Sequence, residues 1–593
     1  MLLHSHVSLA TMSNILEVNE MVWRLLDTQD LAQCARVNKA WHKAILPHLW
    51  RDTAPYLYHK QEEAFGRVVL EDYLYEQQKK TKESEHVMDQ PTQPTWSSSL
   101  PALTKYCRWI QKAKGPEELL SILGRLIISS GQNQATPERS GRAELPTAHE
   151  LLQHFYWRCP VLQVGHMRLS TRVIDSDAQL FKMITEDVVL RVRHLEFGER
   201  YGLGHISIQP SKLKRLLDRL SSTLEFLHIE LHILATQKEE SDLGDDTEES
   251  KVWPKLKYLA LRLYVDSPDQ GSFKRWLWRR CGHVRVLTMY EVGESVVQSL
   301  AEDMPTCMPN VQEFDMGPNS RYHEQLKDHE IAAILNGSRQ GWKRVWTRPL
   351  SHFGNASKEA LARHFSTLEE LWMDGCKDFQ GQDQVRALAF CPNLHTFTSI
   401  NDGGYPRDTI LRPIGASTFI DRDPSTGSLK PWLCEESLKD LKVMISDIPR
   451  PDLKTYGLIR ESYPGQGREL QDLVYERIAR FTNLETLWLG MDSYNTDPGS
   501  NGSCEDDDDE EEGQWFQRNC LEMSLNSGLR KLSGLKNLRE LSVIDMEHKI
   551  RLKDVQWMVK TWPKLKTIFG LSWKGRTKHA VEWLKKNHPK IGI

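Results

Sequence analysis

The chain has 593 residues, with 77 Lys and Arg side chains against 81 Asp and Glu side chains. This length predicts more than one domain or one extended array. Because the two signs of charge nearly balance, no overall field favours nucleic acid or an anionic membrane, and we expect proteins as partners.

No stretch reaches the roughly 20 apolar residues of a membrane-spanning helix. Residues 1–13 lack the basic flank and apolar core of a secretory signal. The ten cysteines are scattered without a Cys-x-x-Cys pair, which favours reduced thiols over disulfides. We therefore expect a cytoplasmic or nuclear protein, or one found in both compartments.

Residues 14–52 are patterned as short helices. Val18, Val22 and Leu26 recur on one helix face, and a second stripe begins after Asp27 and ends before Pro47. Helices this short bury too little surface to be stable alone, so the apolar stripe predicts a partner helix.

The same segment resembles an F-box in its acidic, apolar and Trp positions. These are Glu17, Leu26-Asp27, Asp30-Leu31, Val37-Asn38-Lys39, Trp41 and Leu49-Trp50. The resemblance implies docking on the Skp-type adaptor of a cullin-RING ubiquitin ligase. The residues that would contact the adaptor are Ile15, Val18, Val22, Leu26, Leu31, Val37, Trp41 and Trp50.

Residues 53–147 combine two polar stretches, 82–101 and 132–146, with a segment between them that is helical in pattern and in which Leu119 to Ile127 would face a common core. We expect this segment to join the F-box to the rest of the chain and to cap the domain that follows.

A short signature recurs in the remainder, residues 148–593. Its copies that contain Pro are Cys159-Pro-Val-Leu162, Trp253-Pro-Lys-Leu256, Met308-Pro-Asn-Val311, Cys391-Pro-Asn-Leu394 and Trp562-Pro-Lys-Leu565. The fullest copy, Leu368 to Cys376, fits the leucine-rich-repeat pattern at every apolar position. Anchors in the first half lie about 30 residues apart. A generic α/β domain with chance matches is the alternative for any single copy.

These repeats predict an α/β fold, in which a curved leucine-rich-repeat solenoid with one parallel sheet on its concave face follows the all-α F-box helices. The whole chain resembles F-box/leucine-rich-repeat proteins of the fungal type. We expect loop insertions near residues 237–251, 401–430 and 492–517, the last of which includes the acidic run from Glu505 to Glu512.

Lys274 to Arg280 pairs basic residues with aromatics, as a phosphate-binding surface does, but on a repeat helix this spacing more often places Trp in the core and Arg in water. His323-Glu324 with His329 misses the four-residue spacing of a zinc-binding helix. We find no candidate catalytic residue, metal site or cofactor motif. A dispersed active site remains the alternative, because catalytic triads are recognised in space.

The residue between the last two apolar positions of each repeat strand faces outward, because side chains alternate along a strand. These positions predict a ladder across the concave face: Glu196, His228, Ala260, Thr288, Asp315, Trp372, Thr398, Lys442, Trp488, Ser542 and Phe569. We select His228, Asp315, Trp372, Lys442 and Trp488 as substrate-binding candidates. The two Trp side chains either face a protein substrate or lie under a loop of the chain.

The sequence thus predicts a non-catalytic receptor that holds an unidentified protein target near an associated ubiquitin-transferring enzyme. Asn14-Ile15 replaces the Leu-Pro pair that opens most F-boxes. The alternative is therefore a repeat scaffold or sensor without a ligase connection.

Overall fold

The structure is a computed structural model. It describes residues 112–113, 147, 150–152, 163–169, 181–187, 190–197, 210–233, 252–265, 271–316, 326–347, 352–373, 376, 378–400, 413–450, 464–490, 520–544, 546–573 and 575–593. The chain forms two compact units, Met1–Lys257 and Tyr258–Ile593. The predicted F-box, with all eight adaptor-contact residues, and the expected insertions at 237–251 and 492–517 lie outside the described residues.

The first unit contains a parallel sheet of order β1-β2-β3-β4. Its elements are β1 (Lys112–Ala113), β2 (Gln163–Leu169), η2 (Met183–Asp187), β3 (Arg191–Phe197), α10 (Pro210–Leu220) and β4 (Phe226–Ile233). In β3, Val192, Leu195 and Phe197 are buried, whereas His194 and Glu196 share the opposite, half-buried face. Strand β1 falls inside the segment that the sequence predicted to be helical.

The second unit begins with regular strand and helix alternation. The elements are β5 (Tyr258–Val265), α11 (Gly271–Arg280), β6 (Val286–Val292), α12 (Glu294–Cys307), β7 (Glu313–Met316), α13 (Asp328–Gly337), β8 (Arg344–Thr347), α14 (Asn355–Ala362), β9 (Glu370–Met373), α15 (Gly381–Phe390) and β10 (Thr396–Thr398). Each strand from β6 to β10 pairs in parallel with the strand before it in the sequence.

The later part of this unit is less regular. Its elements are β11 (Ile414–Gly415), α16 (Ala416–Ile420), β12 (Asp440–Lys442), β13 (Ile445–Ser446), α17 (Pro464–Ala479), β14 (Thr486–Trp488), η5 (Leu529–Gly534), β15 (Glu540–Ser542), α19 (Leu552–Thr561), β16 (Thr567–Phe569), η6 (Gly575–Thr577) and α20 (Lys578–Asn587). The main sheet continues through β10-β12-β14-β15-β16, while β11 and β13 form a separate pair.

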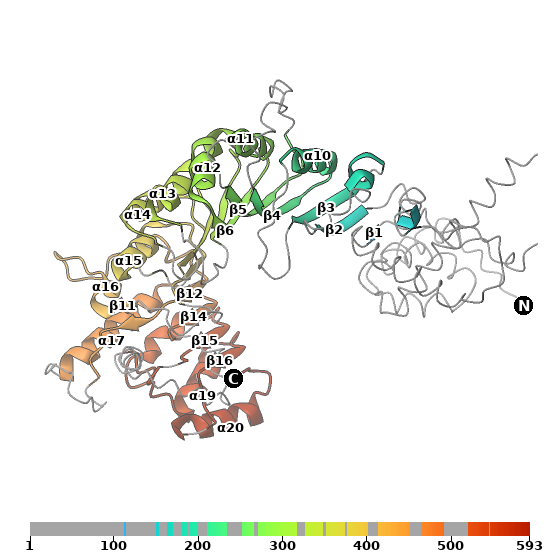
Figure 1. Cartoon of the computed structure of the whole chain (residues 1–593). Coiled ribbons are helices and arrows are strands. Elements are labelled where there is room, and N and C mark those ends of the chain that lie inside the picture. The colour runs from blue at the N-terminus through green and yellow to red at the C-terminus, as the bar shows by residue number, and fades with distance from the viewer. Residues whose placement is uncertain are drawn as a thin grey trace, which may run out of the picture. The chain divides into compact units, whose positions relative to one another are not determined.

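Within the second unit the strands follow one another along an open arc, and the helices α11 to α17 cover its outer side (Figure 1). The sheet is parallel throughout and does not close on itself. This arrangement confirms the predicted α/β class and the parallel sheet of a solenoid. The inner, strand-lined side is the concave face of this unit.

The repeated signature explains how successive strands are held together. Its leucines, such as Leu371 and Leu394, are fully buried and point into the core between sheet and helices. The Asn of the signature joins neighbouring repeats, because Asn310, Asn393 and Asn483 each donate a side-chain hydrogen bond to a backbone carbonyl of the preceding repeat. These bonds satisfy turn carbonyls that the sheet leaves unpaired.

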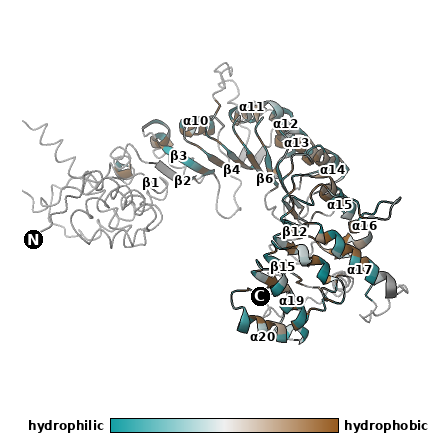
Figure 2. Cartoon of the chain, turned by 180° about the vertical axis from the view of Figure 1, so that it is seen from behind, coloured by the Kyte–Doolittle hydropathy of each residue, from teal (hydrophilic) through white to brown (hydrophobic). Residues whose placement is uncertain are grey.

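The helices are amphipathic, and hydrophobic and hydrophilic residues alternate along them (Figure 2). In α11, Trp276 and Trp278 are buried, and Arg275 and Arg279 are exposed, as the preferred interpretation of this segment expected. Lys274 and Arg280 do not fit the interpretation that the basic side chains lie in water, because both are buried. Lys274 donates to the Ser295 carbonyl, and the Arg280 guanidinium lies 4.3 Å from the centre of the Trp276 ring.

Residues 413–430 belong to a stretch whose composition predicted a loop, but they contain β11 and α16. Apolar residues explain this difference, because Ile414, Ala416 and Phe419 are fully buried. The short pair of β11 with β13 then holds this segment against the chain that leaves β12.

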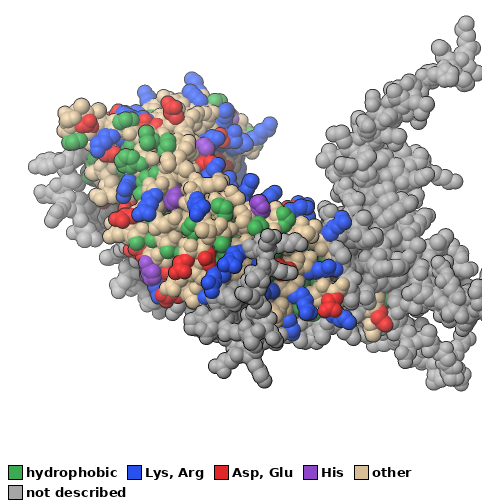
Figure 3. All heavy atoms as spheres, turned by 90° about the horizontal axis from the view of Figure 1, so that it is seen from above, with side chains coloured by type: hydrophobic (Ala, Val, Ile, Leu, Met, Phe, Trp, Pro, Cys, Tyr) green, Lys and Arg blue, Asp and Glu red, His purple; other side chains and the backbone are tan. Residues whose placement is uncertain are grey.

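No helix in the described part of the chain is long and apolar enough to cross a membrane. On the face shown in Figure 3, the side chains of Lys and Arg are interspersed with those of Asp and Glu. This mixture agrees with the nearly balanced charge of the sequence.

Candidate functional site

The predicted ladder on the concave face is in register. In the second unit, Ala260 pairs with Thr288, and the pairing continues strand by strand through Asp315, Trp346, Trp372, Thr398, Lys442, Trp488, Ser542 and Phe569. In the first unit, Glu196 pairs with His228. The repeat pattern therefore predicted the alignment of these side chains correctly.

Exposure along the ladder differs from the prediction. Trp372, Lys442 and Phe569 are half-buried, but Trp488 is only 8% exposed. The expectation that Trp488 is exposed was wrong, because its own ladder neighbours pack on it: Lys442 lies over one side of the indole and Phe569 meets it edge-on. Thr398 and Ser542 are fully buried in the same row.

Three tryptophans, Lys442 and Phe569 form the main part of this surface, which we call the aromatic row. The rings of Trp346 and Trp372 lie 5.8 Å apart, and those of Trp488 and Phe569 are also 5.8 Å apart. Lys442 Nζ lies 3.8 Å from the centre of the Trp488 ring and 5.6 Å from that of Trp372. A cation between two indoles is attracted to both π faces, so Lys442 joins the two aromatic pairs.

Three indole N–H groups of the row and two hydroxyls beside it have no hydrogen-bond partner among the described residues. The indole nitrogens of Trp346, Trp372 and Trp488 are buried and have no hydrogen-bond acceptor among the described residues. The hydroxyls of Thr398 and Ser542 are likewise buried and have no hydrogen-bond partner among the described residues. Each buried unsatisfied donor costs about 1–3 kcal/mol. Because these atoms are buried, an occupant of the sheet face would reach them only after the groups that cover them moved aside.

A charged lane runs beside the aromatic row on β7, β8 and β9, formed by the residues two positions before Asp315, Trp346 and Trp372. Arg344 on β8 bridges Glu313 on β7, at 3.3 Å, and Glu370 on β9, at 3.1 Å. Burial, aided by the neighbouring carboxylates and opposed by Arg344, raises the pKa of Glu370. An aromatic centre beside a polar rim is the composition of a protein-binding surface.

The remaining substrate-binding candidates, Asp315 and His228, are not members of the aromatic row. Asp315 on β7 pairs in register with Trp346, at the edge of the row. His228 on β4 belongs to the first unit, where its neighbours in the sheet are Glu196 and His194. The structure thus brings Trp372, Lys442 and Trp488 together and places His228 in a different environment.

Trp346 is the ladder member that sequence analysis missed. Its repeat contains Val345 but lacks the Leu and Pro of the signature, so only a degenerate copy was expected around it. The spacing did indicate a degenerate repeat around Trp346, because the gap between Phe314 and Leu371 leaves room for one further repeat. The signature was too incomplete there to assign Trp346 to the ladder.

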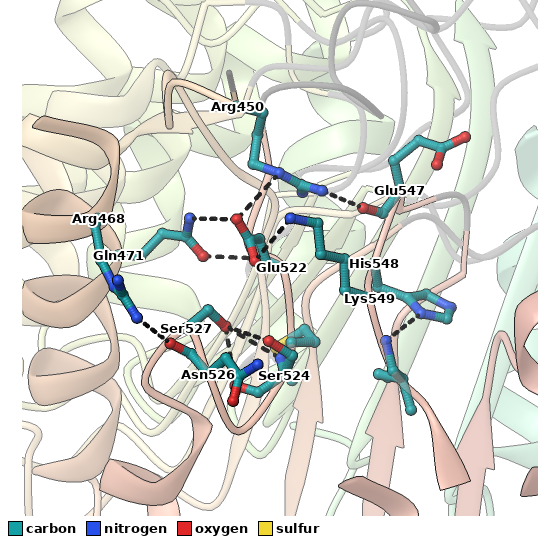
Figure 4. Close-up of polar contacts among 12 residues, drawn as sticks. Arg450, Arg468, Gln471, Glu522, Ser524, Asn526, Ser527, Glu547, His548 and Lys549 are labelled. Carbon is teal, nitrogen blue, oxygen red and sulfur yellow. Dashed lines mark hydrogen bonds and ion pairs between the residues drawn. The ribbon is translucent and has the colours of Figure 1, made fainter. Parts of the chain in front are cut away.

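A second polar cluster lies where the excursions of the second unit meet (Figure 4). Buried Arg450 donates to the carbonyls of Cys520 and Glu547, while Glu522 accepts from Gln471 and pairs with Lys549 at 3.2 Å. Every group has a partner within the protein, so this cluster fastens irregular segments to α17 rather than presenting a ligand site.

Comparisons with known proteins support the F-box prediction. Residues 16–54 match the family model described as F-box-like, so the chain carries an F-box-like domain there. No curated protein matches the chain. Among solved structures, it is similar to the crystal structure of the Rad7 and Elc1 complex in yeast, with 13% identity over 60% of this chain and 77% of that chain. The TM-score of 0.28 is too low for this similarity to carry an argument about function.

Proposed function

We propose that this protein is a non-catalytic substrate receptor, which links a protein target to a Skp-type adaptor and a cullin ubiquitin ligase in the cytoplasm or nucleus. In this proposal the F-box-like domain binds the adaptor, and a leucine-rich-repeat solenoid of the fungal type holds the target. The chemistry then belongs to the associated ligase, and this chain raises the effective concentration of the target lysine.

The observation that carries the proposal is the combination of two features in one chain. Residues 16–54 are F-box-like, and the second unit carries the aromatic row, whose members Trp372, Lys442 and Phe569 are half-buried, on the inner face of its sheet. An adaptor-binding module needs a target-binding surface to act as a receptor. Trp is enriched at protein-binding hot spots, and the charged lane beside the row supplies a polar rim.

The cysteines support a non-catalytic role. A ligase that carries ubiquitin on its own cysteine needs a reactive, accessible thiolate. Burial raises the pKa of Cys434 to about 12 and that of Cys520 to about 11, and it also raises the pKa of Cys281 and Cys391. These four thiols are therefore poor nucleophiles and poor candidates for carrying ubiquitin.

Binding of the purified chain to a purified Skp-type adaptor tests the proposal. We expect the wild-type chain to retain the adaptor on a size-exclusion column and a variant with both Val22→Asp and Leu26→Asp to lose it, because buried charges disrupt an apolar helix interface. The matched variant Lys442→Glu, in the aromatic row, should retain the adaptor fully.

A reconstituted ligase separates the two halves of the proposal. With adaptor, cullin and ubiquitin-charged enzyme present, the Lys442→Glu variant should lose modification of cellular proteins that the wild-type chain supports, while the exposed-helix control Arg279→Ala should not. Absence of adaptor binding by the wild-type chain would overturn the receptor proposal and leave a repeat scaffold or sensor.

A further inference from the structure

The outward face of the first unit carries a cluster of metal-ligand type that no part of the proposed function uses. His166 on β2 lies in register with His194 on β3, and Glu196 follows His194 on the same face of that strand. The Nε2 atoms of both imidazoles approach one carboxylate oxygen, Oε1 of Glu196, at 3.3 Å and 3.1 Å.

We propose that His166, His194 and Glu196 bind a divalent transition-metal ion, with Zn²⁺ the best fit. In a tetrahedral zinc site with bonds of about 2.0–2.1 Å, ligand atoms lie about 3.3 Å apart. Both observed distances to Oε1 match that edge, and all three ligand atoms lie within 4.8 Å of one another. His166 is half-exposed, so its ring can turn to bring its nitrogen to the spacing of a tetrahedral site.

The ligand types select the class of metal. Two imidazole nitrogens and one carboxylate oxygen suit zinc and its neighbours, whereas calcium and magnesium take oxygen ligands. The second group of metal-ligand residues in the described part of the chain contains Glu294, His329 and Glu330 and offers only one nitrogen. The cluster on β2 and β3 is therefore the stronger candidate for a transition metal.

Neighbouring side chains hold the ligands in position. The His194 ring stacks on Phe226, with ring centres 3.7 Å apart. Arg168 lies 3.9 Å from the other carboxylate oxygen of Glu196, which leaves Oε1 to the two histidines. Groups of this kind fix the orientation of ligands around a metal and tune its affinity.

The three residues leave one tetrahedral position for water or for a group from another molecule. His228 lies in register with Glu196 on the next strand, β4. An ion at this place would join β2 to β3 on their outward face, so binding should raise the unfolding temperature of the protein. This inference is independent of adaptor binding and of the aromatic row.

Calorimetric titration of the full chain with ZnCl₂, after treatment with a chelator and without a histidine tag, tests the inference. We expect one ion per chain, and an affinity at least about tenfold weaker in the His194→Ala variant. The matched control His329→Ala, which alters the second group, should bind as the wild-type chain does.

A spectroscopic readout covers the case in which His194→Ala fails to fold. Co²⁺ bound to the wild-type chain should show the visible absorption of a tetrahedral site, and the milder Glu196→Gln variant should weaken it. Absence of stoichiometric Zn²⁺ binding by the wild-type chain, or binding that is lost in His329→Ala and kept in His194→Ala, would overturn the inference.

Discussion

Arg477 shows how one residue can hold the irregular half of the second unit together. Its side chain is completely buried and donates to the carbonyls of Ile420, at 2.7 Å, and Lys430, at 2.6 Å. It also pairs with Glu435 at 3.0 Å and stacks on Trp432. Burial lowers its pKa to about 10 against the opposing effect of Glu435, so the guanidinium stays charged at neutral pH.

We predict that Arg477→Met lowers the free energy of unfolding by about 3–5 kcal/mol, because it leaves the carbonyls of Ile420 and Lys430 without this donor and removes the closest cation from Glu435. Denaturant unfolding measures the change. The control is Arg480→Met, since Arg480 contacts the same carboxylate from a partly exposed position and its loss should cost about 1 kcal/mol or less. Equal losses in the two variants would contradict this account.

Asp328 joins two consecutive helices, α13 and α14. Its carboxylate accepts hydrogen bonds from the backbone amides of Ala356 and Ser357, which begin α14. Burial raises the pKa of Asp328, but the hydrogen bonds from Ser357, Ala356 and Gly354 lower it by more, so the net shift is downward. A lowered pKa in the folded state stabilises the protein above the unfolded pKa of about 4, and this contribution is lost as the pH falls through the folded value.

We therefore predict that Asp328→Asn lowers the free energy of unfolding by about 1 kcal/mol at pH 7, because both carboxylate oxygens accept amide hydrogen bonds and the Asn side chain has only one acceptor oxygen. The difference between wild type and variant should shrink as the pH falls below about 4. Unfolding midpoints measured from pH 7 to pH 3 provide the check, and a difference that stays constant over this range would argue against the cap.

At the scale of elements, backbone approach between neighbouring repeats limits which residues their turns tolerate. A Cβ added to Gly490, at the end of β14, would clash with the carbonyl oxygen of Ile544, which follows β15. The clash is with backbone, so a side-chain rotation cannot relieve it. Gly534, at the end of η5, has open space around the same position.

We predict that Gly490→Ala destabilises the protein by about 1–3 kcal/mol through overpacking. Gly534→Ala, its matched control, should change stability by no more than about 0.5 kcal/mol. Thermal unfolding of the two variants distinguishes these outcomes. A neutral Gly490→Ala would show that β14 and β15 are less closely packed than the structure indicates.

At the scale of the second unit, a helix and a short terminal segment cover the last strand of the sheet. Helix α20 buries Ala580, Val581 and Leu584, and Gly592 exchanges backbone hydrogen bonds with Lys566 and Ile568 beside β16. An uncovered edge strand is a template for pairing with another chain. Capping elements at the end of a repeat array keep such arrays soluble.

We predict that Leu584→Asp releases this cap and promotes self-association, because it places an unpaired charge among buried apolar groups. Light scattering at increasing protein concentration should detect it. Lys586→Ala changes an exposed position of the same helix and should scatter light as the wild-type chain does. Association of both variants alike would point to a cause other than the covered edge.

The sequence predicted the structure best where one residue type recurs at a fixed spacing. The Leu and Pro of each signature predicted the strands, and the alternation of side chains predicted the ladder register from Asp315 to Phe569, because both depend on local spacing. The burial of Trp488 and of Lys274 could not be predicted in this way. Both depend on side chains from neighbouring repeats, which no spacing within one repeat reveals.

The sequence by itself determined the F-box-like domain, the α/β class and the order of the strands, since each is encoded by short apolar patterns. Only the tertiary structure decided which polar groups meet. Arg450 with Glu522, Arg477 with Glu435, and His166 with Glu196 are far apart along the chain. They come together because parallel strands and returning excursions align residues that have no common local pattern.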